Sequence, residues 1–269
     1  MKHLVKKFIR AEKVGNDVTD IISSVPYDEA ALTSLIKNDF DNYYAFIQTN
    51  DNELIQAFPY KRDNKQYIVP EANPVVLYFE CARRNIRYIK QADEALFLEL
   101  DKIRPDNLGI DSKNANATIM LNQFYSYYTL ASISVSFLFN SIEAFINNII
   151  PKDFNYSKET KRHTIVYTKY QIQKETTFED KIKDVLPLIK GKSFQQEFSQ
   201  KWDSIKKLKD FRNEIIHTQS YDQETPNIYL SLYTTALNFD YETTLIHVKD
   251  FLNYYENNLI EECDCGQDY

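Results

Sequence analysis

The chain has 269 residues, of which 43% are hydrophobic and 26% charged, proportions typical of a globular protein with a real core. Its four glycines argue against Rossmann, P-loop and barrel folds, which need glycine at tight turns and phosphate-binding loops. The net charge of −7 and the pI of about 5.3 exclude a surface that is basic as a whole. Any nucleic-acid contact must therefore come from a local basic patch.

Residues 1–70 form a mixed region of unknown role, because no helical periodicity is sustained there. Within it, residues 51–60 and 65–70 are joined by the polar "KRDN" and predict a short β-hairpin. The first residues contain no apolar run of the length that a secretory signal needs. The cysteines show no metal-ligand spacing: Cys81, Cys263 and Cys265. We expect a cytoplasmic protein without a metal or a cofactor.

Helical patterns dominate residues 71–262, ahead of a polar tail at residues 263–269. One helix is expected to begin at Pro74 and to stop before Pro105. A second, over residues 116–150, is very long, because the chain has no glycine or proline between Asn116 and Pro151. Polar residues interrupt its most apolar part and predict a buried helix rather than a membrane span: Asn140, Glu143, Asn147 and Asn148.

The remainder of this region predicts a loop followed by further helices. Residues 151–177 are polar and irregular, as expected for a loop. Helices are expected over residues 178–190, ended by Gly191, and over 193–217, with Ser193 as N-cap. Residues 225–240 are ambiguous between strand and helix, and a last helix is expected from 241 to about 261. The predicted fold class is mainly α: a bundle with long helices and a smaller mixed N-terminal region.

The helix that ends in "KKLKDFRNEIIHT" carries an arginine inside its apolar stripe. On a helical wheel one face collects the apolar side chains, namely Trp202, Ile205, Leu208, Phe211, Ile215 and Ile216. Arg212 falls within this face, and Asn213 and His217 lie together on its edge, four residues apart. A guanidinium in an apolar stripe needs a buried carboxylate partner or an open cleft. Arg212 therefore either forms a structural ion pair or lines a site.

These residues resemble a known family. "RNEIIH" is similar to the Arg-x4-His motif of the HEPN (higher eukaryotes and prokaryotes nucleotide-binding) domains, in which asparagine commonly follows the arginine. The stretch over residues 178–218 resembles the helix pair that carries this motif. "FNSIEAFINNII" resembles the family's earlier core helix, with its acidic residue at Glu143. The resemblance covers residues 116–261.

The resemblance implies an all-α homodimer whose motif helices face each other, so that two arginines and two histidines share one cleft. Catalytic members are metal-independent ribonucleases of toxin–antitoxin or antiphage systems, which makes RNA the expected substrate. The residue types suit this chemistry, because histidine moves protons near neutral pH and arginine matches phosphate with a fixed fork of donors. We expect Arg212, His217 and Asn213 to be catalytic, with Glu143 in support, within hydrogen-bond reach of Arg212 or Asn213.

One departure concerns the expected partner. A branch of the family carries a tyrosine two residues after the motif histidine, which a partner nucleotidyltransferase modifies. Here that position is Gln219, and the nearest tyrosine is Tyr221. This lowers the expectation of such an antitoxin partner, although another antitoxin or defence-system partner stays open.

The same residues also admit purely structural interpretations. His217 suits a cation that caps a helix C-terminus, and a basic run next to it suits either RNA or a solvated face: Lys206, Lys207 and Lys209. Aromatic clusters at residues 124–130 and 254–255 suit base stacking or, more often, packing. The competing hypothesis is a non-catalytic helical module for RNA or protein binding and dimerisation, in which the same residues hold an interface.

Overall fold

The computed structural model describes residues 2, 4–8, 11–13, 45–48, 53–104, 116–159, 163–218 and 229–265. The chain divides into two compact units, Val5–Val76 and a second made of Met1–Leu4 with Leu77–Tyr269. The described residues are mostly helical, which confirms a mainly α chain. The described part of the first unit is a small sheet, and the second unit carries the long helices and the motif.

The N-terminal unit is built around one long strand. Strand β3 (Glu53–Arg62) pairs antiparallel with β1 (Ala11–Lys13), β2 (Ala45–Gln48) and β4 (Lys65–Pro70). The β3–β4 hairpin confirms the predicted one. Its turn residues, Asp63 and Asn64, have φ of 51° and 61°, a left-handed backbone that these two residue types tolerate.

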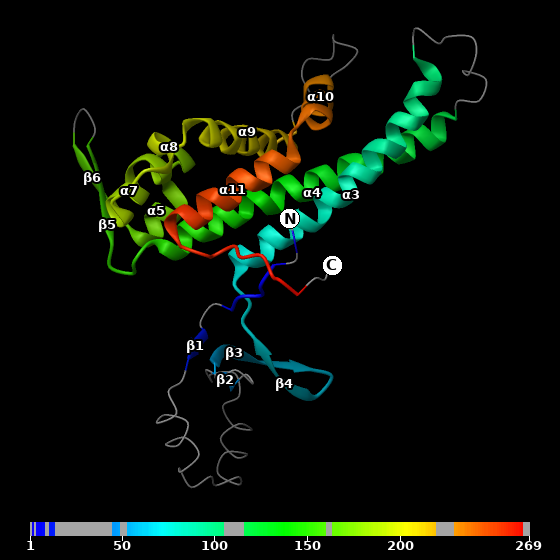
Figure 1. Ribbon diagram of the computed structural model, residues 1–269. Coiled ribbons are helices and arrows are strands. Elements are labelled where there is room, and N and C mark those ends of the chain that lie inside the picture. Colours follow the sequence, from blue (N-terminus) through cyan, green and yellow to red (C-terminus); the bar gives the residue numbers. More distant parts are fainter. Residues whose placement is uncertain are drawn as a thin grey trace. The chain divides into compact units, whose positions relative to one another are not determined.

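The two longest helices of the second unit are α3 and α4 (Figure 1). Helix α3 (Pro74–Leu100) continues into a short 3-10 turn, Asp101–Ile103, and helix α4 spans Ala117–Ile149. The Asn116 side chain caps α4 by accepting hydrogen bonds from the backbone N–H groups of Thr118 and Ile119. Both helices were predicted, and the Tyr78 and Phe137 rings pack them together with centroids 5.8 Å apart. By length and composition α4 would cross a membrane, but half of its most apolar window is buried, as in the core helix of a bundle.

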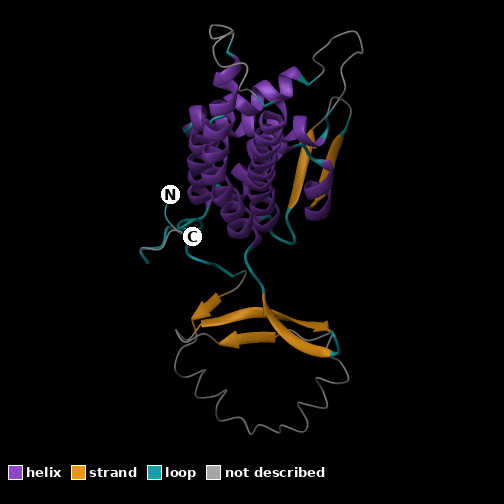
Figure 2. Ribbon diagram, turned by 90° about the vertical axis from the view of Figure 1, so that its right-hand side faces the viewer, coloured by secondary structure: helices purple, strands orange, loops and turns teal. Residues whose placement is uncertain are grey.

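The described residues of the segment expected to be a loop, 151–159 and 163–177, contain regular structure. They form strands β5 (Asn155–Glu159) and β6 (Thr164–Thr168), followed by helix α5 (Lys169–Glu175), beside the helices in Figure 2. The Tyr156 hydroxyl donates to Asp184 at 2.9 Å, and the Lys158 ammonium donates to Asp180 at 2.6 Å. The loop prediction is wrong because polar strands of this kind are fixed by partners that follow them in the chain.

The next helical stretch contains a widened turn. Helix α6 (Phe178–Asp180) runs into a π-helical turn, Lys181–Val185, and then into α7 (Leu186–Lys190). Pro187 lies just beyond the wide turn and has no N–H with which to close an α-helical turn. The helix ends as predicted at Gly191, whose φ of 66° is a left-handed backbone conformation that glycine adopts readily.

The motif helix packs with its apolar face against several of the other helices. It is α9 (Ser199–Ile216), separated from the short α8 (Phe194–Glu197) by a break at Phe198, where a single helix was expected. Phe198 leaves the helical conformation while its ring packs on Phe194 and Tyr254. Helix α9 contacts α4, α10 (Leu230–Asn238) and α11 (Tyr241–Tyr255).

The C-terminal end closes the bundle. The ambiguous segment is helical in α10, and Tyr127 of α4 and Tyr241 of α11 both donate hydrogen bonds to the Ala236 carbonyl at its end, each 2.7 Å long. Helix α11 ends at Tyr255, earlier than predicted. Asn258 then takes a positive φ of 57°, and the chain turns so that the Asn253 side chain bonds both backbone groups of Ile260.

Candidate functional site

The site lies on the last two turns of α9, where the apolar face ends. Side chains on this face are at most 3% exposed from the first turn of the helix to its fourth: Trp202, Ile205, Leu208 and Phe211. The predicted continuation of the face is wrong at Ile216, which is 50% exposed. The last turn of the helix is only partly covered, with Ile216 and His217 exposed. Arg212 therefore sits where the stripe opens.

Arg212 is held on several sides. Its Nη1 donates a hydrogen bond to Oδ1 of Asn213 at 3.1 Å, and its Nη2 lies 3.8 Å from Oε2 of Glu143. The guanidinium carbon lies 5.2 Å from the ring centroid of Phe139, one turn before Glu143 on α4. Its side chain is 22% exposed, so part of the charged group faces solvent. The sequence-predicted Arg212, Asn213 and Glu143 are thus brought together.

The Glu143 contact is looser than expected. A hydrogen bond to Arg212 or Asn213 was expected, but 3.8 Å is an ion pair beyond hydrogen-bond distance. Glu143 is 43% exposed, so water shares in solvating its carboxylate. The Arg212 Nε atom is buried and has no hydrogen-bond partner among the described residues. The structure thus positions the guanidinium without saturating its donors.

His217 closes α9. Its backbone N–H donates to the Asn213 carbonyl at 2.9 Å, and its backbone leaves the helical region there. Its imidazole is exposed, and no described residue makes a hydrogen bond or ion pair with it. It is therefore open to solvent at the same helix end as Arg212.

The basic run is largely paired within the chain. Lys206 contacts Asp203 at 2.7 Å, and Lys209 is bound to Glu179, one residue into α6. Lys207 is exposed, and none of the described residues pairs with it. Of the three lysines singled out for RNA, Lys207 alone presents an ammonium that the structure leaves to solvent.

The aromatic clusters support packing. Phe124 and Tyr128 of α4 both pack edge-on against Tyr233 of α10, and Tyr254 and Tyr255 pack against Phe194. None of these rings lies in the contacts that surround Arg212.

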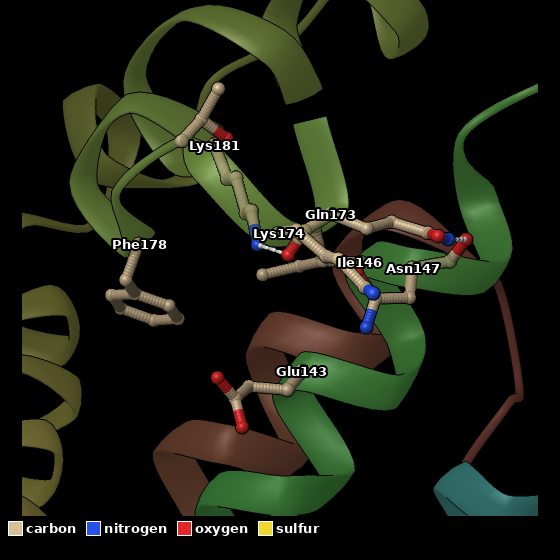
Figure 3. A pocket seen from close by; sticks show the side chains of 8 residues that line it. Glu143, Ile146, Asn147, Gln173, Lys174, Phe178 and Lys181 are labelled. Carbon is tan, nitrogen blue, oxygen red and sulfur yellow. Dashed lines mark hydrogen bonds between the residues drawn. The ribbon is translucent and has the colours of Figure 1, made fainter. Parts of the chain in front are cut away.

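A polar pocket of about 190 Å³ lies next to the group formed by Arg212, Asn213 and Glu143, and Glu143 belongs to both (Figure 3). Residues from α4, α5 and the π-helical turn line it. Sequence reasoning did not find the contributions of Lys181 and Phe178, because these segments meet only in three dimensions. The polar stripe of α4, at Glu143 and Asn147, was the one signal available.

The comparisons with known proteins add no assignment. No family model, curated protein or solved structure matches this chain. Within the described residues, no group of three or more histidine, cysteine, aspartate or glutamate side chains could hold a metal ion. Gln219 and Tyr221, which bear on the nucleotidyltransferase partner, lie outside the described residues.

Proposed function

We propose that this protein is a metal-independent endoribonuclease of the HEPN type, with Arg212, Asn213 and His217 in its active site. One observation carries the proposal. A guanidinium fixed by Asn213, Glu143 and Phe139 stands on the last turns of a helix, and the residue that closes this helix, His217, carries an exposed imidazole that no described residue engages. A structural ion pair alone would not account for an unengaged histidine at the same helix end.

The chemistry follows from what RNA brings. The 2′-OH is the nucleophile: it loses its proton, bonds to phosphorus and expels the 5′-oxygen, which gains a proton. The products are a 2′,3′-cyclic phosphate and a 5′-OH. The Arg212 guanidinium would stabilise the charge that develops on the phosphate oxygens, and His217 would transfer a proton. Because the nucleophile belongs to the substrate, no metal-activated water is required.

Two proton transfers require two groups, whereas one chain offers one motif histidine. A second copy with its own His217 across a two-fold axis would supply the other group. The proposal therefore includes a homodimer whose motif helices face each other. By the same resemblance, we propose a toxin or antiphage-defence effector as its setting.

The test is cleavage of a fluorescent single-stranded RNA in EDTA. His217→Ala should lower the rate by roughly 10²-fold or more because proton transfer is lost, and Arg212→Ala should do the same through lost phosphate stabilisation. Product analysis should show 2′,3′-cyclic phosphate ends.

The matched controls are His163→Ala and Arg87→Ala, which change exposed residues of the same unit outside the motif. Both should cleave like the unaltered protein. If the folded double variant at positions 212 and 217 cleaves as fast as the unaltered protein, the ribonuclease proposal fails. RNA binding without cleavage would instead favour the non-catalytic binding module.

A further inference from the structure

The pocket next to Arg212 has few polar groups available to a ligand. Three of its polar side chains are already engaged: Gln173 donates to the Asn147 carbonyl at 3.1 Å, Thr176 donates to the Ile172 carbonyl at 2.6 Å, and Lys174 is bound to the Tyr170 hydroxyl. The other polar side chains that line the pocket are those of Glu143, Asn147 and Lys181, and the Phe178 ring lines it with them (Figure 3).

The remaining groups comprise two acceptors and one donor. Asn147 Oδ1 is buried and has no hydrogen-bond partner among the described residues. Glu143 lies four residues before it on α4, so the two acceptors stand one helical turn apart on one face. An unmatched buried acceptor is costly, which favours a ligand that brings N–H donors.

Lys181 supplies the donor. Its ammonium makes one hydrogen bond, to the Gln173 carbonyl at 2.7 Å, and two N–H groups remain. Burial lowers the pKa of Lys181, and the charge of Glu143 partly offsets this, so the two groups are close enough to interact. The π-helical turn begins at this residue, a local distortion that is frequent at functional sites.

The pattern of donors and acceptors selects the ligand. A free phosphate would be repelled by the Glu143 carboxylate, whereas a neutral planar ring would not. Guanine alone among the RNA bases offers two adjacent donors, N1–H and the N2 amino group, next to an acceptor, O6. Glu143 would accept from N1–H and N2–H, Asn147 from the second N2 hydrogen, and Lys181 would donate to O6.

We propose that this pocket binds a guanine base. Its role as a substrate subsite rests on the proposed ribonuclease function, because Glu143 contacts Arg212 and so would place the base beside the phosphate that is cut. The protein would then cleave RNA next to a guanosine. Base binding itself does not depend on cleavage.

The experiment measures nucleoside binding by the full-length His217→Ala variant, in which catalysis is removed. The chain has one tryptophan, Trp202, whose ring stacks on Phe178 at 5.9 Å, so its fluorescence reports on the pocket. Guanosine should change this fluorescence saturably and bind at least about tenfold more tightly than adenosine, with inosine in between. Equal binding of guanosine and adenosine, binding of inorganic phosphate instead, or no binding would overturn the proposal.

Two variants tie the binding to the pocket. Lys181→Met should weaken guanosine binding about tenfold, whereas Lys183→Met, two residues along and exposed, should leave it unchanged. Asn147→Leu should weaken binding comparably and keep or raise the melting temperature, because it removes an unmatched acceptor. Guanosine binding that is intact in both pocket variants would overturn the proposal. Guanosine binding without RNA cleavage would contradict the ribonuclease alone.

Discussion

Arg212 shows how one residue departs from the pattern around it. It occupies a position that helical spacing assigns to the core, and its Nε is buried without a described partner, at a cost of about 1–3 kcal/mol. The Asn213 hydrogen bond and the Phe139 ring fix its orientation, while the Glu143 ion pair is long. An apolar residue of similar size would pack here at lower cost. The arrangement supports the proposed chemical role of Arg212 over a purely stabilising one.

Glu143→Gln tests this residue-scale interpretation. The variant keeps the shape and removes the charge that faces Arg212. Because the pair is long and Glu143 is partly exposed, the free energy of unfolding should change by less than about 1 kcal/mol. The cleavage rate should fall by about tenfold, because the guanidinium loses part of its orientation. Chemical denaturation and cleavage rates measure the two effects separately.

The control is the same substitution in an Arg212→Ala background. If Glu143 acts by positioning Arg212, adding Glu143→Gln there should lower kcat no further. A full additional tenfold loss in kcat would show that Glu143 acts independently of the arginine.

At the scale of elements, the periodicity of apolar residues predicted those features of the helices that depend on nearby sequence. The buried positions of α9 as far as Phe211 followed from apolar spacing, and the bounds of α4 from the absence of glycine and proline between Asn116 and Pro151. The β5–β6 hairpin did not, because its ties run to Asp180 and Asp184, more than twenty residues away. The exposure of Ile216 likewise depends on how the rest of the chain packs, which apolar spacing alone does not give.

The contact between α9 and α11 predicts a pH dependence. His247 shares a 2.8 Å hydrogen bond with Ser204, and its pKa is lowered from 6.5 by burial and by Lys201, against the opposing charges of Asp250 and Asp240. The unfolded chain therefore takes up this proton first as pH falls. Neutral His247 therefore makes its full contribution to the free energy of unfolding above about pH 6.5. This contribution decreases as the pH falls from there to the lower pKa of His247 in the folded protein.

Urea unfolding between about pH 7.5 and pH 5.5 checks this expectation. The free energy of unfolding should decrease as pH falls, and His247→Gln should flatten the decrease. His163→Gln, at an exposed position, is the matched control and should keep it. An unchanged slope in His247→Gln would assign the pH dependence to other groups.

At the scale of the whole molecule, the net charge of −7 has to be reconciled with an RNA substrate. Intramolecular ion pairs engage Lys206 and Lys209, so the described end of α9 offers RNA mainly the cations of Arg212 and Lys207. A second copy facing the first would double these cations in one cleft. Dimerisation would thus create a local basic patch that one acidic chain lacks.

The sequence could predict the motif but not the pocket, which three separate segments form.

Assembly is the last prediction. Ile216 is 50% exposed at the end of the motif helix, so half of an apolar side chain is left uncovered there, and we expect it to contact a second copy. Sedimentation should give twice the monomer mass for the unaltered protein. Ile216→Asp should give folded, inactive monomers, because the second His217 is removed from the site. Leu188→Asp, at a comparably exposed position of α7, should remain dimeric and active. A monomer at micromolar concentration that still cleaves RNA would contradict the shared site, because a single chain would then perform both proton transfers.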